Sequence, residues 1–259
     1  MRLKLILNCQ PHGKLSLNYA YALQAVIYKV LERADPVFSH WLHEKGYDAL
    51  GRNFKLFTFS ELRGTPFRID RDTQTIQYGT NRLTWVVSFC VDAQVEKFVM
   101  GLFQNQRLEV VTPAGRMDFD VQNVEIISPP PLSITTRYRA TMPICISENQ
   151  EGRAQAAYLS PWDAHFEQLF FSNLENKFKA AHGMEQTTIN TESPRLKILS
   201  EPRSRKFDVI KKNLSRPIGV KGYQFDFEIT APIEWQRIGY DAGFGGKNSG
   251  GFGFCEVLK

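Results

Sequence analysis

Apolar residues alternate with polar ones at the start of the chain and then take up a helical spacing. Leucine occupies every second position of residues 3–7, which predicts a first strand within residues 1–9. From Asn18, a residue type that can cap a helix, apolar side chains recur every three or four positions as far as Arg33. The pattern predicts a strand followed by an amphipathic helix.

The rest of the first half continues with helices and strands. Asp35-Pro36 is typical of a helix start and Gly46 of a helix end, and Asp92 is a further candidate cap. The apolar phase changes near Gln122-Asn123, which predicts a β-bulge there. The expected elements are helices at 35–46 and from residue 92, with strands at 55–60, 83–91, 107–111 and 116–127.

Three consecutive prolines, residues 129–131, are the best candidate for a domain boundary. After them the order of elements repeats. The expected elements are a strand at 132–136, a helix from Ser160-Pro161 to Gly183, a basic hairpin within 195–221, a strand at 223–229, a helix from Pro232 to Asp241 and a last strand at 252–258. Each half therefore has roughly the order strand–helix–strand–strand–helix–strand. We expect an α+β fold of two tandem ferredoxin-like domains, residues 1–128 and 129–259.

Positive charge is concentrated in one stretch of the second half. The 259-residue chain has a formal net charge of +5 and a pI near 9.0. Residues 195–221 alone contain nine lysines and arginines against two carboxylates. A charge run is often only a solvated face, but this excess is larger than that of the whole chain and favours a polyanion as partner. The cations expected to contact phosphates are Arg203, Arg205, Lys206, Lys211 and Lys212.

The cysteines and histidines do not form a metal-binding pattern. The four cysteines are far apart, and free buried thiols are typical of a reducing compartment, so we expect a cytoplasmic protein. No signal peptide and no membrane-spanning segment is expected. His40 and His43 are three positions apart on a predicted helix, but the pattern offers no third ligand. We therefore expect no metal and no other cofactor.

A glycine-rich tract lies near the C-terminus. Six of the eleven residues from Gly243 to Gly253 are glycine, which accepts positive φ and lets the backbone approach a ligand. A loop of bare N–H groups around one lysine can hold an anion. The P-loop pattern fails because Asn248 follows Gly246-Lys247, and G-x-G-x-x-G fails at the same asparagine. The structural alternative is an ordinary glycine-rich hairpin or β-bulge.

The tract Gly-Phe-Gly-Gly-Lys-Asn-Ser-Gly-Gly-Phe-Gly, followed by a last strand, resembles the C-terminal glycine-rich signature of the RAMP superfamily. Within that superfamily it is most similar to the sixth family of CRISPR-associated proteins, the endoribonucleases that cut CRISPR precursor RNA. The resemblance implies that the loop contacts RNA. The residues expected to do so are Gly243, Gly245, Gly246, Lys247, Asn248, Ser249, Gly251 and Gly253.

A second stretch resembles the N-terminal region of the same family. There, a tyrosine on the first helix, a histidine in an L-H-E segment and a lysine opening a K-L-F-T strand form the catalytic group. The resemblance implies that Tyr28, His43 and Lys55 are catalytic. The insert 45–54 is longer than a minimal turn, which departs from the family pattern. Each residue alone also has a structural interpretation: a helix-surface aromatic, a cation at a helix C-terminus and a solubilising strand end.

These residue types suit RNA cleavage because RNA carries its own nucleophile, the 2′-OH. Histidine titrates near neutrality and can transfer protons, tyrosine can donate or orient a proton, and lysine can neutralise charge on the phosphate. The resemblance implies metal-independent cleavage of CRISPR repeat RNA, leaving a 5′-hydroxyl and a 2′,3′-cyclic phosphate. Other CRISPR effector subunits are further candidate partners, and the oligomeric state stays open. Two other functions remain open: a non-catalytic RNA-binding subunit of a CRISPR effector complex, and a protein-interaction scaffold.

Overall fold

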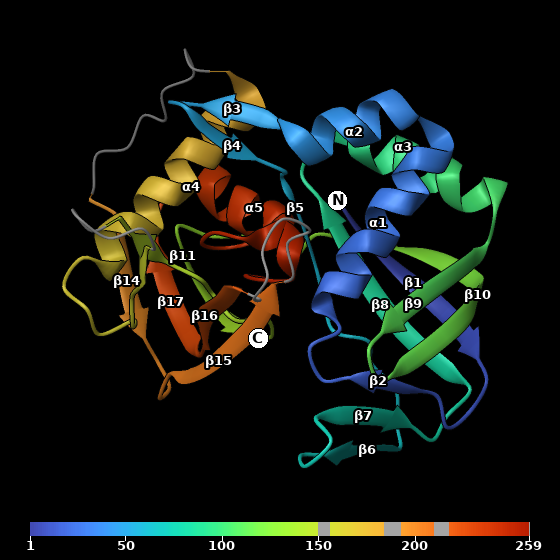
Figure 1. The fold of residues 1–259 in the computed structure, drawn as a ribbon. Helices are drawn as coiled ribbons and strands as arrows, with labels where there is room; N and C mark the ends of the chain where they lie inside the picture. The colour runs from blue at the N-terminus through green and yellow to red at the C-terminus, as the bar shows by residue number, and fades with distance from the viewer. Residues whose placement is uncertain (150–155, 184–192, 210–217, 259) are drawn as a thin grey trace. The chain divides into compact units, whose positions relative to one another are not determined.

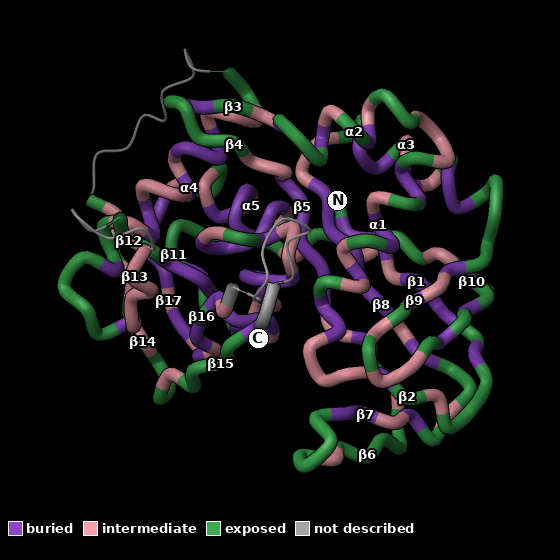
Figure 2. Tube along the Cα trace, viewed as in Figure 1, coloured by how far each residue is buried: buried purple, intermediate pink, exposed green. Residues whose placement is uncertain are grey.

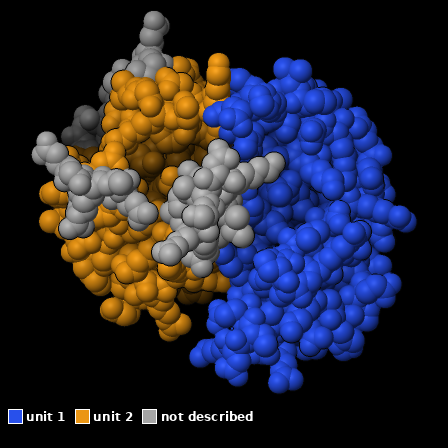
Figure 3. All heavy atoms as spheres, viewed as in Figure 1, with its two compact units in different colours: residues 1–44, 59–128 blue, residues 45–58, 129–259 orange. Residues whose placement is uncertain are grey.

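The chain divides into two compact units (Figure 3). Each unit has its own sheet and helices. The computed structural model describes residues 1–149, 156–183, 193–209 and 218–258 (Figure 1). Unit 1 comprises residues 1–44 and 59–128, and unit 2 comprises residues 45–58 and 129–259. The division after residue 128 coincides with the expected boundary. The segment 45–58, which we expected in the N-terminal domain, packs with unit 2 instead.

Unit 1 is built around a sheet with the strand order β5-β8-β1-β10-β9, in which β1 pairs antiparallel with both β8 and β10. The leucines on one face of β1 are buried, and on the other face Arg2 and Ile6 are buried, whereas Lys4 is half-buried and Asn8 is exposed. Figure 2 shows the burial of each residue along the chain. This is the ferredoxin-like order with β9 added at the edge. The elements are β1 (Arg2–Cys9), β2 (Lys14–Ser16), α1 (Ala20–Ala34), α2 (Pro36–Glu44), β5 (Phe57–Phe59), β6 (Phe67–Asp70), β7 (Thr75–Tyr78), β8 (Arg82–Phe89), α3 (Asp92–Gln104), β9 (Arg107–Thr112) and β10 (Gly115–Ile127).

Two predicted features of unit 1 are confirmed, and one sheet was not predicted. The bulge in β10 lies at Gln122, because Ile6 pairs with Asn123 while Leu7 pairs with Val121. The apolar stripe of α1 is buried and packs on α3, where a Cβ on Gly101 would be only 1.9 Å from the backbone oxygen of α1 that it faces. The small sheet β2-β7-β6 has no counterpart in the expected order of elements.

The start of α2 agrees with the predicted cap. Asp35 Oδ1 accepts a hydrogen bond from the Phe38 N–H at 2.9 Å, which satisfies one of the first amides of the helix. Asp35 Oδ2 also accepts from Lys97 Nζ of α3 at 2.6 Å. The bond from Lys97, followed by the one from Phe38, lowers the pKa of the Asp35 carboxyl below its usual range. The cap therefore also joins α2 to α3.

Unit 2 has a four-stranded sheet with the order β14-β17-β11-β18, again the ferredoxin-like arrangement. Its core is largely aromatic: Phe170 of α4 and Phe227 of β17 are both fully buried, with ring centroids 6.0 Å apart. The hairpins β3–β4, β12–β13 and β15–β16 are added to this core. The elements are β3 (Tyr47–Ala49), β4 (Arg52–Phe54), β11 (Thr135–Ala140), β12 (Ser147–Glu148), β13 (Ala157–Tyr158), α4 (Phe166–His182), β14 (Arg195–Ile198), β15 (Arg203–Val209), β16 (Ile218–Gln224), β17 (Asp226–Thr230), α5 (Ile233–Ala242), the 3₁₀ turn η1 (Asn248–Gly250) and β18 (Cys255–Val257).

Several helices begin differently from the sequence signals. Helix α4 starts at Phe166, because the Asp163 carboxylate accepts from the Ser160 N–H at 2.6 Å and holds the preceding residues in a turn. Asn18 is not the cap of α1, which starts without a side-chain cap bond, and Asp92 is the first residue of α3 rather than its cap. None of the helices in the described residues is long and apolar enough to cross a membrane.

Two expected strands of unit 2 have different limits. The alternating stretch 223–229 is divided at Phe225, where the chain leaves the β15–β16 hairpin and enters the four-stranded sheet. The strand expected at 132–136 begins only at Thr135. Ser133 and Thr136 form a local turn, in which the Ser133 N–H donates to Thr136 Oγ1 at 3.2 Å. A local turn bond thus overrides the apolar pattern before Thr135, and a change of strand partner divides the stretch at Phe225.

Candidate functional site

The tyrosine and the histidine implied as catalytic lie together in unit 1. Tyr28 is on α1 and His43 is in the last turn of α2. Their ring centroids are 4.8 Å apart, with the ring planes at 81°. Ser39 Oγ donates to the backbone oxygen of Tyr28 at 3.0 Å and so ties α2 to α1. This helix pair sets the edge-to-face contact of the two rings.

A carboxylate lies beside the histidine. His43 Nδ1 is 2.9 Å from Glu44 Oε1, and both side chains are 59% exposed. A carboxylate that accepts from one ring nitrogen fixes the tautomer of a histidine. His40 is exposed on the same helix and provides a comparison residue for His43. Among the described residues, no group of three or more His, Cys, Asp or Glu side chains could hold a metal ion.

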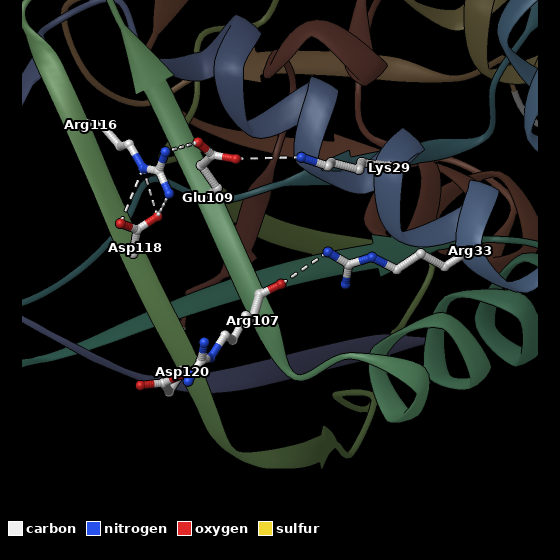
Figure 4. Close-up of polar contacts among 7 residues, drawn as sticks. All are labelled: Lys29, Arg33, Arg107, Glu109, Arg116, Asp118 and Asp120. Carbon is white, nitrogen blue, oxygen red and sulfur yellow. Dashed lines mark hydrogen bonds and ion pairs between the residues drawn. The ribbon is translucent and has the colours of Figure 1, made fainter.

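Polar contacts hold the tyrosine-bearing helix α1 to the edge strand of unit 1 (Figure 4). Lys29 Nζ is 3.4 Å from Glu109 Oε2 of β9. Arg33 donates to the backbone oxygens of Asn105 and Arg107 at 2.8 and 3.1 Å. Exposed ion pairs contribute only about 0–1 kcal/mol each. Their main effect is therefore to orient α1 on the sheet.

Lys55 belongs to unit 2, where it lies beside the glycine-rich loop. It stands between β4 and β5 and is followed by Leu56, which has a φ of 53°. The expected strand from residue 55 therefore begins only at Phe57. Lys55 lines a pocket of about 580 Å³ whose walls include Lys247 of the loop and Lys177 of α4. The structure thus brings Lys55 and the loop lysine to one pocket within unit 2.

The pocket of unit 2 is positively charged. In the part of the chain that the structure describes, its charged lining consists of four cations and one carboxylate: Arg52, Lys55, Lys177, Lys247 and Glu148. Glu148 Oε1 lies 2.9 Å from His165 Nδ1. The Cys145 thiol is also in the wall, and burial raises its pKa to about 12. It is therefore not a thiolate near neutral pH, and the pocket is suited to an anion.

The glycine-rich loop is held in shape by its own phenylalanines and asparagine. Phe244 and Phe252 are fully buried, and the Phe244 ring stacks on Phe170 of α4 at a centroid distance of 5.7 Å. Asn248 donates from Nδ2 to the backbone oxygens of Phe244 and Phe252 at 3.1 and 3.0 Å. The side chain of Asn248 thus points inward and closes the loop.

Glycine is needed at specific positions of the loop for steric reasons. Gly245 and Gly253 have φ of 68° and 73°, a region that L side chains rarely adopt. An added Cβ would lie 2.7 Å from the Cys145 oxygen in the first case and 2.0 Å from the Phe244 oxygen in the second. A Cβ on Gly250 would meet nothing within 4 Å. Glycine is therefore required at positions 245 and 253, whereas position 250 has room for a side chain.

The expectation of a loop of bare N–H groups is wrong for several residues. The N–H groups of Gly246 and Gly253 donate to the oxygens of Cys145 and Pro143 at 2.7 and 2.8 Å. Three further N–H groups, those of Phe244, Gly250 and Gly251, donate to carbonyl groups within the loop. Fewer N–H groups of the loop are therefore available to an anion than the sequence suggested. Lys247, which lines the pocket, precedes the turn η1 with a φ of 60°.

A buried cation beneath the loop was missed by the sequence interpretation. Lys177 is 2% exposed and donates to the backbone oxygens of Gly243 and Gly245 at 2.5 and 2.6 Å. It follows the buried Leu174 by three residues and so lies in the apolar stripe of α4. A lysine at a stripe position is the sequence signal that would have found it.

The predicted basic hairpin is confirmed as β15–β16. Lys206 lies directly opposite Lys221 in the register. Like charges in this position destabilise a strand pair, so a negatively charged partner would be favourable here. Arg203 and Arg205 lie in the same strand as Lys206, whereas Lys211 and Lys212 lie outside the described residues.

The hairpin is connected to the glycine-rich loop by aromatic contacts. The Arg205 guanidinium lies 5.1 Å from the ring centroid of Phe207. The Phe207 ring in turn lies 4.9 Å from that of Phe252, one of the buried residues of the loop. The two regions expected to contact RNA are therefore packed against each other in unit 2.

Each unit has a ferredoxin-like sheet, and the glycine-rich loop precedes the last strand of unit 2. The fold is similar to that of a solved structure described as "An RAMP protein binding different RNA substrates", with a TM-score of 0.81, 16% sequence identity and full coverage of both chains. The α+β fold with two such domains is thus confirmed. Residues 14–125 match the family model of the N-terminal part of CRISPR-associated protein Cas6, and residues 128–257 match that of the C-terminal part. The chain belongs to the Cas6 family of CRISPR-associated proteins.

Two curated relatives extend over nearly the whole chain. One is "CRISPR-associated endoribonuclease Cas6 1" of Methanocaldococcus jannaschii, which is 26% identical over 265 residues, with 100% of this chain and 93% of the relative covered. The other is "CRISPR-associated endoribonuclease Cas6" of Pyrococcus furiosus, which is 22% identical over 252 residues, with 94% of this chain and 84% of the relative covered.

Proposed function

We propose that this protein is an endoribonuclease that cuts CRISPR precursor RNA within its repeats. Both curated relatives are named endoribonucleases, and the likeness extends over both units. The 2′-OH of the nucleotide before the cut attacks the neighbouring phosphorus, and the bond from phosphorus to the 5′-oxygen breaks. One product ends in a 2′,3′-cyclic phosphate and the other begins with a 5′-hydroxyl. No metal ion takes part.

Three side chains carry the reaction in this proposal. His43 transfers a proton, and the carboxylate of Glu44 at Nδ1 makes Nε2 the nitrogen that exchanges it with RNA. Tyr28 donates or orients a proton at the same phosphate. Lys55 neutralises the charge that develops on the phosphorane. The proton lost by the 2′-OH and the proton gained by the 5′-oxygen balance, so no other reactant is consumed.

The observation that carries this proposal is the contact of the Tyr28 and His43 rings at 4.8 Å in unit 1. A tyrosine and a histidine on two successive helices, held by the Ser39 bond, form a pair suited to proton transfer. The resemblance to the family picked out the same two residues from the sequence. This agreement between the sequence resemblance and the ring contact supports a catalytic role for the two residues over a purely structural one.

RNA binding in this proposal is the task of unit 2. The glycine-rich loop supplies Lys247 and Ser249, together with backbone that glycines Gly243, Gly245, Gly246, Gly251 and Gly253 and the inward amide of Asn248 keep in shape. Arg203, Arg205 and Lys206 of β15 contact phosphates, as do Lys211 and Lys212. Sheets and loops of this kind stack bases of single-stranded RNA while cations meet the phosphates.

The proposed setting is the cytoplasm, where CRISPR transcripts are made and thiols stay reduced. The repeat RNA is the main partner, and other CRISPR effector subunits are further partners of the processed RNA. The buried free thiols Cys9, Cys145 and Cys255 agree with a reducing compartment.

The proposal is tested by incubating the purified protein with end-labelled repeat RNAs in EDTA. Cleavage at one phosphodiester, with a 2′,3′-cyclic phosphate on the upstream fragment, is the expected result. Salt-sensitive binding without cleavage would make the protein a non-catalytic RNA-binding subunit. Absence of salt-sensitive binding would contradict the proposal and favour the protein-interaction scaffold.

A further inference from the structure

Lys177 is a buried cation of α4 that contacts the backbone of the glycine-rich loop. The side chain is 2% exposed, in the middle of α4, and its Nζ donates to Gly243 O at 2.5 Å and to Gly245 O at 2.6 Å. Burying an ammonium group is costly unless it is hydrogen-bonded. Two charge-assisted bonds to neighbouring carbonyl groups offset that cost and at the same time fix the direction of those carbonyls.

Three successive carbonyl groups of the loop are occupied by side chains. Lys177 binds the oxygens of Gly243 and Gly245, and Asn248 binds the oxygen between them, that of Phe244, at 3.1 Å. Because the carbonyl directions fix the peptide planes, these bonds determine how the chain enters the turn that carries Lys247. The positive φ values of Gly243 and Gly245, 92° and 68°, belong to the same arrangement.

Helix α4 supports the loop at a second point. The Phe170 ring stacks on the Phe244 ring at 5.7 Å with an angle of 9° between the planes. Phe170 lies two turns before Lys177 on the same helix. One rigid helix therefore holds both the ring and the flanking carbonyl groups of the loop segment 243–245.

We infer that Lys177 is a positioning residue that holds the glycine-rich loop in the form in which Lys247 meets RNA. The inference rests on the proposed RNA-binding function of the loop. Both lysines line the pocket of about 580 Å³, so the charge of Lys177 also adds to the positive potential of its wall. Lys177 acts on RNA through the loop and not through a contact of its own.

The first test measures the loop without RNA. Trypsin cuts after Lys247 only when the loop opens, and the cut releases the C-terminal peptide 248–259, which mass spectrometry quantifies. Methionine is similar to lysine in length but has no charge and no donors. Lys177→Met should raise the rate of this cut by about tenfold or more, because losing a hydrogen bond from a charged group raises the population of the open loop by about that factor. Lys177→Arg, which keeps charge and donors, should restore much of the protection.

The matched control is Lys179→Met. Lys179 lies two residues further along α4 and pairs with Glu175 Oε1 at 2.6 Å on the same helix, without a bond to the loop. Its replacement should leave the rate of the cut at Lys247 unchanged. If Lys177→Met does not fold, as judged by circular dichroism, Lys177→Gln replaces it in the same assays with the same expected direction.

The second test is a double-mutant cycle with RNA. Lys247→Ala should weaken RNA binding in the wild-type background but should have little further effect once Lys177 is Met, because the loop lysine is already misplaced. A merely structural role would leave the effect of Lys247→Ala the same in both backgrounds. An equal effect of Lys247→Ala in both backgrounds would overturn the inference. The inference would also be overturned if the Lys177→Met variant were cut at Lys247 as slowly as the wild type. Failure of the wild type to bind or cut repeat RNA overturns the proposed function instead, and the trypsin assay then decides the inference alone.

Discussion

His43 and Tyr28 are placed by the backbone and ring contacts of helices α1 and α2. His43 is 59% exposed at the end of α2, and its ring meets that of Tyr28 edge to face. Removing either functional group changes the chemistry of the site more than its packing. The two residues are therefore good subjects for kinetic tests.

We expect His43→Ala to slow cleavage by about 10²- to 10⁴-fold, because this is the usual contribution of a positioned proton-transfer group. RNA affinity should stay nearly the same. Tyr28→Phe and Lys55→Ala should also be slower. Single-turnover rates with saturating RNA measure the effect, and His40→Ala on the same helix is the control. Wild-type cleavage by His43→Ala would show that the histidine has no catalytic role.

Two glycines of the loop should respond differently to substitution. Gly245→Val places a Cβ 2.7 Å from the Cys145 oxygen at a φ of 68°, so it should weaken RNA binding or folding. Because shape and not charge is lost, the salt dependence of the remaining binding should be unchanged. Gly250→Ala, where a Cβ meets nothing within 4 Å, should bind RNA like the wild type. Equal effects of the two substitutions in filter-binding titrations would contradict this.

The hairpin β15–β16 brings its positive charges together on one added element of unit 2. Lys206 and Lys221 face each other across the strands, and Phe207 anchors the hairpin on the loop residue Phe252. The cations of the hairpin can therefore be replaced without removing the contact between Phe207 and Phe252. The contribution of the hairpin to RNA binding should thus appear mainly as a dependence on salt.

Replacing Arg203, Arg205 and Lys206 with glutamine should weaken RNA binding. It should also flatten the slope of log K against log salt by about two units, since each phosphate contact on single strands contributes about −0.7. The cleavage position should not change. The control variant replaces Lys29, Arg107 and Arg116, which are paired with carboxylates in unit 1, and removes the same charge. An unchanged slope in the hairpin variant would mean that its charges only face solvent.

The proposed proton-transfer pair lies in unit 1, and the glycine-rich loop and the β15–β16 hairpin lie in unit 2. The chemistry of the proposed cleavage can be tested through the RNA rather than through the protein. RNA with a 2′-deoxy nucleotide before the cut lacks the proposed nucleophile but keeps every phosphate. It should bind with wild-type affinity.

We expect this deoxy substrate to remain uncut, while the same substitution one nucleotide downstream has no effect on the rate. EDTA should leave the rate with ordinary RNA unchanged. Denaturing gels of end-labelled RNA measure both results. Cleavage of the RNA that is deoxy before the cut would mean that the 2′-OH is not the nucleophile.

Much of the fold could be predicted from the sequence because strands and helices have local periods. The leucines of β1 alternate and are buried on one face, and the change of phase in β10 marked the bulge at Gln122. The glycine tract 243–253 pointed to the family through its resemblance to a known signature. The pair Tyr28 and His43 also came from the sequence, through resemblance to that family.

Other features depend on contacts between residues far apart in the chain, which no local pattern contains. Lys177 donates to the carbonyl group of Gly243, which is 66 residues away in the chain. The turn held by Asp163 precedes α4, so the helix starts at Phe166 and not at Ser160 as predicted. The segment 45–58 joins unit 2 because hairpin β3–β4 packs on α4. Asn248 turns inward because the backbone oxygens of the buried phenylalanines need a donor. Local side-chain preferences thus determine where most helices and strands form. Burial and hydrogen bonding in the folded chain determine which distant residues each side chain contacts.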